Sequence, residues 1–199
     1  MSQTKDKILQ RINEKNYGAF TTSDFIDIDN YKVISKTLER LDDEKVISRI
    51  RRGIYYLTKY NDILGIEEMP DINEIAKAIA RQFNIIIIPS SNYALNIIGI
   101  STQVPSKYIY ITNGSYNEYK IGNNTIYFKH STSREITNLP YKILVAIQAL
   151  KTIGKDRINS FVKEKISCFL SIEDKEYIKK NNLRITSWIY DELKIIGAM

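Results

Sequence analysis

The chain has almost none of the residues that hold small disulfide-bonded or metal-bound proteins together. Its 199 residues include one cysteine, Cys168, and one histidine, His130. A single cysteine cannot form an intrachain disulfide, which suits a reducing compartment. One histidine with no second histidine or cysteine nearby does not make a zinc site. The sequence therefore predicts a cytoplasmic protein with no metal and no cofactor, in which Cys168 is a small buried hydrophobe.

Long apolar runs are missing as well. The longest unbroken aliphatic stretch, IIII at 85–88, ends at Pro89 and is far too short to cross a bilayer. The first ten residues, MSQTKDKILQ, lack the apolar core of a signal peptide. Hydrophobic residues still make up 43% of the chain, enough to build a core and to argue against wholesale disorder. We expect one large domain or two small ones, and no membrane partner.

The sequence also lacks the signatures of the common enzyme classes. It contains no glycine-rich phosphate-binding loop. His130 is the one base that a classical triad could use, and its strand neighbours should point away from it. Two Glu-x-Lys triplets, at 173–175 and 192–194, lie in predicted helices, whereas a metal-dependent nuclease site usually needs them on a strand. We therefore expect no catalytic residue.

Positive charge is what the sequence does have. The net charge is +6 and the sequence pI is about 9.2, which favours an anionic partner such as nucleic acid. Residues 1–60 contain 12 Lys and Arg against 9 Asp and Glu, and residues 61–199 contain 17 against 14. Each part is thus +3, so the charge is denser in the shorter N-terminal part.

The N-terminal residues predict two helices, one long and one short. Residues 4–16 place apolar side chains along one helical face. Thr21 and Asp24 then have the spacing of a capping box, in which the carboxylate reaches back to the cap amide. They predict a short helix that ends near Asp27.

A longer helix follows, with Asp29 or Asn30 as its cap. Within it, Ile34, Leu38 and Leu41 recur at i, i+4 and i+7, which is the spacing of a buried stripe.

Two short strands come next, VISRI at 46–50 and GIYYL at 53–57. The RRG sequence between them predicts a hairpin turn, because Gly53 can adopt a positive φ. Tyr55 and Tyr56 occupy alternate sides of the second strand, so one of them should pack in the core.

Helix, short helix, helix and hairpin is the order of a winged helix-turn-helix. The longer helix would enter the major groove by its N-terminal half, and the hairpin arginines would meet phosphates or a minor groove. Glu39 and Asp43 would repel phosphate, so only the first two turns of the helix should approach DNA closely. The predicted DNA-binding residues are Tyr31, Lys32, Ser35, Lys36, Arg40, Arg49, Arg51 and Arg52. The competing interpretation is an ordinary solvated charged face.

Residues 58–70 are expected to link this domain, residues 1–60, to a second one at 70–199. The second domain should contain helices over 71–83 and 141–153, a helix that Gly99 ends, strands over 84–89 and 106–112, and a hairpin over 117–130. Three more helices should follow Gly154. The predicted fold class is α+β: an N-terminal winged helix-turn-helix, then a mixed α/β domain with a helical C-terminal end; the resemblance described next implies that this second domain is antitoxin-like.

These segments resemble a known family. FTTSDFIDIDNYKVISKTLERLDDEKVISRIRRGIYYL, with its DF helix, L-x-R-L pattern and RGIY hairpin, is similar to the winged-helix domain of the AbiEi-type antitoxins. SNYALNIIGISTQVPSKYIYITNGS, followed by IYFKH, resembles the C-terminal domain of the same group. The resemblance covers most of residues 3–154, and residues 155–199 match no motif.

The resemblance implies a type IV toxin–antitoxin regulator. Such a protein would repress its own operon by binding double-stranded DNA, and would counter a nucleotidyltransferase-like toxin without forming a stable complex with it. The positions that match the DNA-reading part of the pattern are Lys32, Ser35, Lys36, Arg49, Arg51 and Arg52. Two alternatives stay open: a ligand-sensing regulator whose residues 70–199 bind a small molecule, and an enzyme with a DNA-targeting module.

Overall fold

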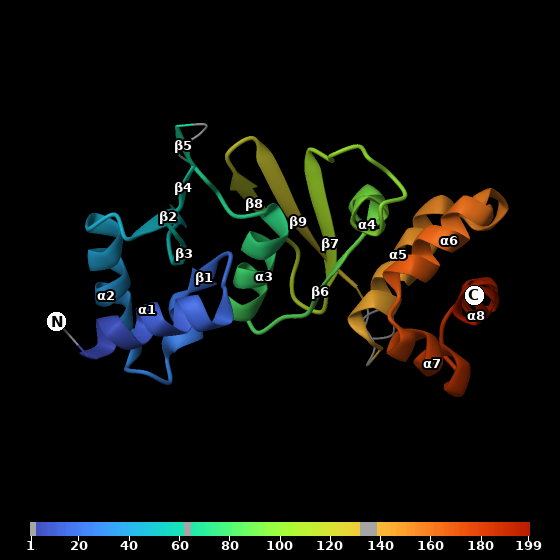
Figure 1. The fold of residues 1–199 in the computed structure, drawn as a ribbon, viewed down its shortest axis with the longest axis horizontal. Helices are drawn as coiled ribbons and strands as arrows, with labels where there is room; N and C mark the ends of the chain where they lie inside the picture. Colours follow the sequence, from blue (N-terminus) through green and yellow to red (C-terminus); the bar gives the residue numbers. More distant parts are fainter. Residues whose placement is uncertain (1–2, 62–64, 132–138) are drawn as a thin grey trace. The chain divides into compact units, whose positions relative to one another are not determined.

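The computed structural model describes residues 3–61, 65–131 and 139–199. Contacts between Cα atoms divide the chain into two units, residues 1–85 and residues 86–199. Helices and strands occur in both units (Figure 1), so the chain is an α+β protein, as the sequence predicted.

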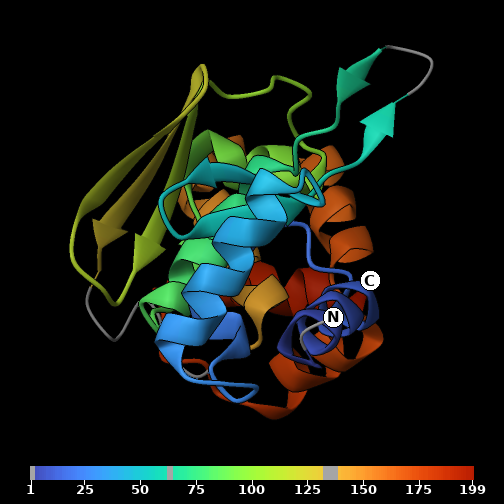
Figure 2. The ribbon, with the colours of Figure 1, turned by 90° about the vertical axis from the view of Figure 1, so that its left-hand side faces the viewer.

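The first unit begins with the predicted helix, short helix, helix and hairpin in the predicted order, together with a short strand, β1, that the sequence did not predict. They are α1 (Gln3–Lys15), β1 (Phe20–Thr21), the 3₁₀ helix η1 (Thr22–Phe25), α2 (Tyr31–Asp43), β2 (Ile47–Arg51) and β3 (Ile54–Leu57). The three strands form an antiparallel sheet in the order β1-β3-β2. A two-stranded ribbon, β4 (Tyr60–Asn61) and β5 (Ile66–Glu67), follows and extends away from the helices of this unit (Figure 2). The unit ends with α3 (Ile72–Gln82).

Local chemistry fixes the start of α2 and of the short helix before it. The Asn30 side chain accepts a hydrogen bond of 3.1 Å from the N–H of Val33, so Asn30 is the cap of α2. The N–H of Thr21 donates to the Asp24 carboxylate at 2.8 Å, as the capping-box spacing predicted. The element that follows is a single turn of 3₁₀ helix that spans four residues, Thr22–Phe25.

A part-buried ion pair joins α3 to the rest of the first unit. Arg81 Nε donates to Asp24 Oδ1 at 2.7 Å, and the Arg81 guanidinium also donates to the carbonyl of Ala19 at 2.8 Å. Only 6% of the Asp24 side chain is exposed. Because this contact spans 57 residues of sequence, the helix expected to open the second domain lies with the first unit. The division falls between Ile85 and Ile86, beyond the linker expected at 58–70.

The second unit contains a four-stranded sheet and five helices among the residues described. Its strands are β6 (Ile87–Pro89), β7 (Lys107–Thr112), β8 (Asn117–Ile121) and β9 (Asn124–His130), in the order β6-β7-β9-β8. β7 and β9 run parallel, and the other neighbouring pairs are antiparallel. The helices are α4 (Ser91–Ile98), α5 (Tyr141–Ile153), α6 (Ser160–Phe169), α7 (Ile172–Lys180) and α8 (Ser187–Ala198), with a 3₁₀ turn η2 (Lys155–Arg157) after α5.

Helix α5 forms the centre of the second unit's core. Every residue from Ile143 to Leu150 is buried, so this helix is covered on all sides. It packs against Ile88 of β6 and Ile111 of β7, and against apolar residues of α4, α6, α7 and α8. Figure 1 shows these helices gathered on the β6–β7 side of the sheet, away from β8.

One prediction about burial was wrong. Cys168 is exposed on α6, because it lies two residues, or about 200° around the helix, from the buried Ile166. Tyr55 packs in the core of the first unit, as predicted. Tyr56 is buried as well, at 7% exposure, so the hairpin is covered on both faces at this point. Within the described ranges, no helix is both long enough and apolar enough to cross a bilayer.

Candidate nucleic-acid interface

Helix α2 has one buried face and one charged face. Ile34, Leu38 and Leu41 are fully buried, and they pack with Ile8 and Phe20 in the core of the first unit. The predicted stripe is therefore confirmed. Its burial fixes which α2 side chains point to solvent, because positions on the opposite face follow from the 3.6-residue repeat.

The predicted α2 contact residues lie mainly on the solvent side. Tyr31 is 61% exposed, Lys32, Lys36 and Arg40 are exposed, and Ser35 is half-buried. None of the three basic side chains forms an ion pair with another described residue. Their charges are therefore available to an anionic partner.

Two acids restrict how much of this face can approach DNA. Glu39 and Asp43 are exposed and fall on the same side of α2 as Lys36, at i+3 and i+7. A phosphate near the C-terminal half of α2 would meet these carboxylates. The basic part of the face is thus the first two turns, with Arg40 on its flank.

The hairpin after α2 carries the predicted arginines. Arg49, Arg51 and Arg52 are all exposed, and Gly53 adopts a φ of 79° at the turn, as predicted. The pairing is irregular, because Arg49 faces Tyr55 while Arg51 faces the next residue back, Ile54. This β-bulge breaks the simple alternation under which Arg49 and Arg51 would share one face.

A carboxylate of α2 holds the hairpin in place. Asp42 Oδ1 accepts a 3.1 Å hydrogen bond from the backbone N–H of Arg49, and Asp42 Oδ2 lies 3.4 Å from Arg49 Nε. The charge of Arg49 is therefore partly neutralised by Asp42. The sequence analysis predicted only that Arg49 binds DNA. Nothing in the local sequence pointed to Asp42, because the contact depends on how β2 returns beside the end of α2.

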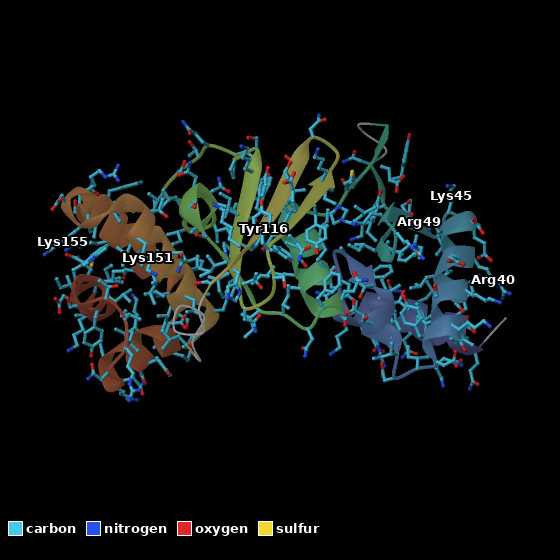
Figure 3. The ribbon with its side chains drawn as sticks, turned by 180° about the vertical axis from the view of Figure 1, so that it is seen from behind. Arg40, Lys45, Arg49, Tyr116, Lys151 and Lys155 are labelled. Atoms are coloured by element: carbon cyan, nitrogen blue, oxygen red, sulfur yellow. The ribbon has the colours of Figure 1, made fainter. Side chains whose placement is uncertain are left out.

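Lys45 is an exposed cation that the sequence analysis did not select. It lies between α2 and β2 with a φ of 59°, the position after the helix cap that glycine usually occupies. The N–H of Lys45 donates to the Asp42 carbonyl and that of Val46 to the Leu41 carbonyl. Figure 3 shows Lys45, Arg40 and Arg49 on the α2–β2 part of the chain, with Arg40 extending outward from α2.

The phenol of Tyr55 lies under this surface. Burial raises the pKa of Tyr55, and the nearby charge of Arg49 opposes that effect. Tyr55 belongs to the same core cluster as Leu38. The hairpin is therefore packed against α2 by an apolar ring as well as braced by Asp42.

The β4–β5 ribbon is tied to the hairpin by a second phenol. Tyr56 donates a 2.6 Å hydrogen bond to the Glu67 carboxylate. Burial first, and then this bond, raise the pKa of Tyr56 to about 12. Bonds from Ser48 and Tyr56 lower the pKa of Glu67. These shifts describe a neutral phenol bonded to an ionised carboxylate.

A half-open cavity of about 530 Å³ lies elsewhere in the first unit. Its walls come from α1 and β3 with the residues that follow each of them, from the segment before α3, and from α3 itself. They include Tyr17, Tyr56, Lys59, Glu68 and Glu74. A ligand-sensing regulator was expected to hold its ligand in residues 70–199, whereas most of this cavity is built from residues before 70.

No group of three or more His, Cys, Asp and Glu side chains in the described parts of the chain could hold a metal ion. His130 ends β9 and is exposed. Its Nδ1 lies 2.9 Å from the carbonyl oxygen of Gly114. That oxygen can only accept, so Nδ1 donates the hydrogen bond.

The net charge is distributed differently when the chain is divided at the structural boundary between Ile85 and Ile86. Residues 1–85 contain 14 basic and 14 acidic residues, whereas residues 86–199 contain 15 basic and 9 acidic residues. The first unit is therefore neutral overall, and its cations matter by their position on α2 and the hairpin. The whole formal excess of +6 belongs to the second unit.

The described residues thus define an α+β protein whose first unit presents exposed lysines in the first two turns of α2 beside an arginine hairpin. The chain belongs to DUF6088, a family of unknown function, whose model matches residues 7–178 and so spans both units. A comparison with curated proteins finds no match.

Proposed function

We propose that this chain is a transcriptional repressor that binds double-stranded DNA at its own operator through a winged helix-turn-helix. The observation that carries the proposal is the pairing of two exposed features: the lysines in the first two turns of α2, and the arginine hairpin that Asp42 braces beside that helix. A groove-reading helix and a phosphate-contacting hairpin are the two parts that such a domain needs.

The arrangement of the first unit supports this assignment. The order α1-β1-η1-α2-β2-β3, with a β1-β3-β2 antiparallel sheet, matches the order of a winged helix. In this interpretation η1 stands in for the helix before the recognition helix, and α2 is the recognition helix. The β2–β3 hairpin is then the wing.

The distribution of charge along α2 determines which end of the helix approaches DNA in this proposal. Lys32 and Lys36 face the groove at the N-terminal half of α2, while Glu39 and Asp43 keep the C-terminal half away from phosphates. Arg52, at the hairpin turn, is suited to the flanking backbone.

The likeness to AbiEi-type antitoxins supports a second part of the proposal. In it, the chain also counters a nucleotidyltransferase-like toxin without a stable complex between them, and it has no catalytic activity of its own. The support for this part is the sequence resemblance of residues 3–154, and the experiment for it is separate from the DNA experiment. Co-expression with the product of an adjacent gene should restore growth, and failure to restore it removes the antitoxin role while leaving DNA binding intact.

The DNA experiment uses duplexes from the region upstream of the gene, with the full-length chain, across a salt series. A Lys32→Gln/Lys36→Gln/Arg52→Gln variant should lose most operator affinity, and its salt slope should fall by about 0.9 for each of these residues that contacts a phosphate, Arg52 among them. The matched control, Lys15→Gln/Lys59→Gln/Lys77→Gln, removes the same charge from the same unit and should bind nearly as the unaltered chain does. Equal losses in both variants would contradict the proposed surface.

The cavity favours one alternative, a ligand-sensing regulator. A small molecule seated against Tyr17 and Tyr56 would contact β3 and so the hairpin. Native mass spectrometry of the purified chain tests this, because a co-purifying small molecule that shifts operator affinity would support sensing. An apparent mass equal to that of the bare chain, with operator binding unchanged by a low-molecular-mass cell extract, would oppose it.

A further inference from the structure

The second unit has an open β-sheet face that carries three lysines. The register of the strands places Lys107 of β7 and Lys120 of β8 on either side of Thr125 in the central strand β9. Lys129, also on β9, lies on this same face because it is four residues from Thr125. All three lysines are exposed, and none forms an ion pair with another described residue.

An aromatic ring lies between the lysines. Tyr127 is part-exposed and sits midway between Thr125 and Lys129 on β9, with Ile109 of β7 on one side and Glu118 of β8 on the other. Strand geometry puts Lys107 and Lys120 about 10 Å apart and Lys129 about 13 Å from their row. The cations therefore surround the ring. Glu118 is the acid on this face.

The rest of the same face is covered. Ile88 and Ile111, on the β6–β7 side, pack beneath the α5 core. Figure 1 shows α4–α8 on that side of the sheet, leaving β8 and β9 beyond the helices of this unit. The lysines and Tyr127 thus occupy the part of the face that the unit's own helices do not use.

Protection of a sheet edge explains only part of this pattern. Lysines often mark edge strands because they prevent pairing with another sheet. β8 is an edge strand, so Lys120 fits that role. Lys107 and Lys129 lie on the interior strands β7 and β9, where no edge needs protection and where three like charges repel one another.

We propose that this face, formed by Lys107, Lys120, Lys129 and Tyr127, binds single-stranded nucleic acid. An open sheet face with a ring and surrounding cations suits a nucleic-acid strand whose bases are free to stack and whose phosphates meet lysines. The Glu118 carboxylate can accept a hydrogen bond from a base amino group. The second unit carries the chain's whole excess charge of +6, which attracts such a strand. This site is distinct from the proposed duplex-binding surface on α2.

The test measures binding of the full-length chain to fluorescent twelve-nucleotide oligo(U) and oligo(dT) by anisotropy across a salt series. Lys107→Gln/Lys120→Gln/Lys129→Gln should weaken binding at least tenfold and lower the salt slope by about 2, at about 0.7 per contact on a single strand. The matched control is Lys155→Gln/Lys179→Gln/Lys180→Gln, which removes the same charge from α7 and η2 of the same unit. It should change affinity less than threefold.

Variants of Tyr127 distinguish the contribution of base stacking to binding from that of the lysine charges. Tyr127→Ala should weaken binding roughly 5- to 150-fold, whereas Tyr127→Phe keeps the ring and should bind as the unaltered chain does. Circular dichroism confirms that each variant is folded. Stronger binding of oligo(U) identifies RNA as the ligand, and equal or stronger binding of oligo(dT) identifies DNA or both. No binding of either oligonucleotide by the unaltered chain, or equal losses in the two triple variants, would overturn the proposal.

Discussion

The backbone N–H of Arg49 donates to the carboxylate of Asp42 at 3.1 Å, seven residues back along the chain. One end of this contact is on α2 and the other is on β2, so the relation between helix and hairpin is set by a hydrogen bond as well as by packing. The Asp42 side chain is only 17% exposed, which protects the bond from competing water.

Replacement of Asp42 by alanine should loosen the hairpin at Arg49. Loss of the acceptor leaves the Arg49 amide without its partner, a cost of about 1 kcal/mol, or roughly a fivefold faster hydrogen exchange of that amide. Asp43→Ala, next to it and exposed, removes the same charge and should leave the exchange rate nearly unchanged. NMR hydrogen exchange on the full-length chain measures both. Equal exchange in the two variants would mean that the bond does not hold the hairpin.

Replacement of Asp24 by alanine should lower the unfolding free energy more than replacement of most other acidic residues in the first unit. Its side chain accepts from Arg81 and from Thr21, and only 6% of it is exposed. Asp24→Ala leaves a half-buried guanidinium unpaired, which should cost roughly 3 kcal/mol of unfolding free energy. Asp27→Ala breaks an exposed surface pair with Arg11 and should lower the unfolding free energy far less than Asp24→Ala does, because water screens the pair. Thermal denaturation of both variants checks the order.

Sequence analysis predicted correctly the features that depend on neighbouring residues, such as helix caps and the buried face of a helix. Asn30 caps α2 through Val33, and Gly99 ends α4 with a φ of 79°, because caps depend on neighbours within four residues. The stripe of Ile34, Leu38 and Leu41 is buried for a similar reason. Periodicity alone identifies one face of a helix.

The remaining features depend on contacts between distant residues. No local pattern indicates that Arg81 reaches Asp24, so α3 could not be assigned to the first unit. The bulge between Arg49 and Arg51 depends on how β2 pairs with β3. Cys168 was judged by its residue type, although its spacing from Ile166 would have placed it on the exposed side of α6.

Lys45 adopts a left-handed backbone conformation that costs a non-glycine residue about 1 kcal/mol. Lys45→Gly should therefore raise the unfolding free energy by about 0.5–1 kcal/mol relative to Lys45→Ala, which keeps the strain. Both variants lose the same charge, so a difference between them in urea denaturation reports the backbone alone. If the alanine variant is as stable as the glycine variant, the turn is not strained at this position.

The first unit should lose stability in alkali through Tyr56. An unfolded tyrosine titrates near pH 10, whereas burial and the bond to Glu67 raise the pKa of Tyr56 to about 12 in the folded chain. Between these values the unfolded state releases its proton first, so stability falls as pH rises. Below about pH 10 the contribution of Tyr56 is complete. Tyr56→Phe removes this proton and should show a shallower decline in urea denaturation from about pH 9 to about pH 12, and an equal decline would contradict the assignment.

Substitutions of Lys36 and Arg52 should affect DNA binding differently, because we expect Lys36 to contact a base and Arg52 to contact a phosphate. Lys36 lies on the exposed face of α2 within the part free of acids. If it contacts a guanine edge, Lys36→Ala should cost roughly 1–3 kcal/mol at the operator and relax the preference at one base position. Its effect on a scrambled duplex should be much smaller.

Arg52 follows β2 at the hairpin turn, and in the proposed binding mode it contacts a phosphate of the flanking DNA backbone. A phosphate contact carries no sequence information, so Arg52→Ala should weaken operator and scrambled duplex alike and lower the salt slope by about 0.9. A larger loss on A·T-rich duplexes would instead place the arginine in a narrow minor groove. Binding of both variants, with Lys77→Ala as the control, is measured on both duplexes across a salt series. If neither variant differs from Lys77→Ala, α2 and the hairpin do not contact DNA, and their cations belong to a solvated surface.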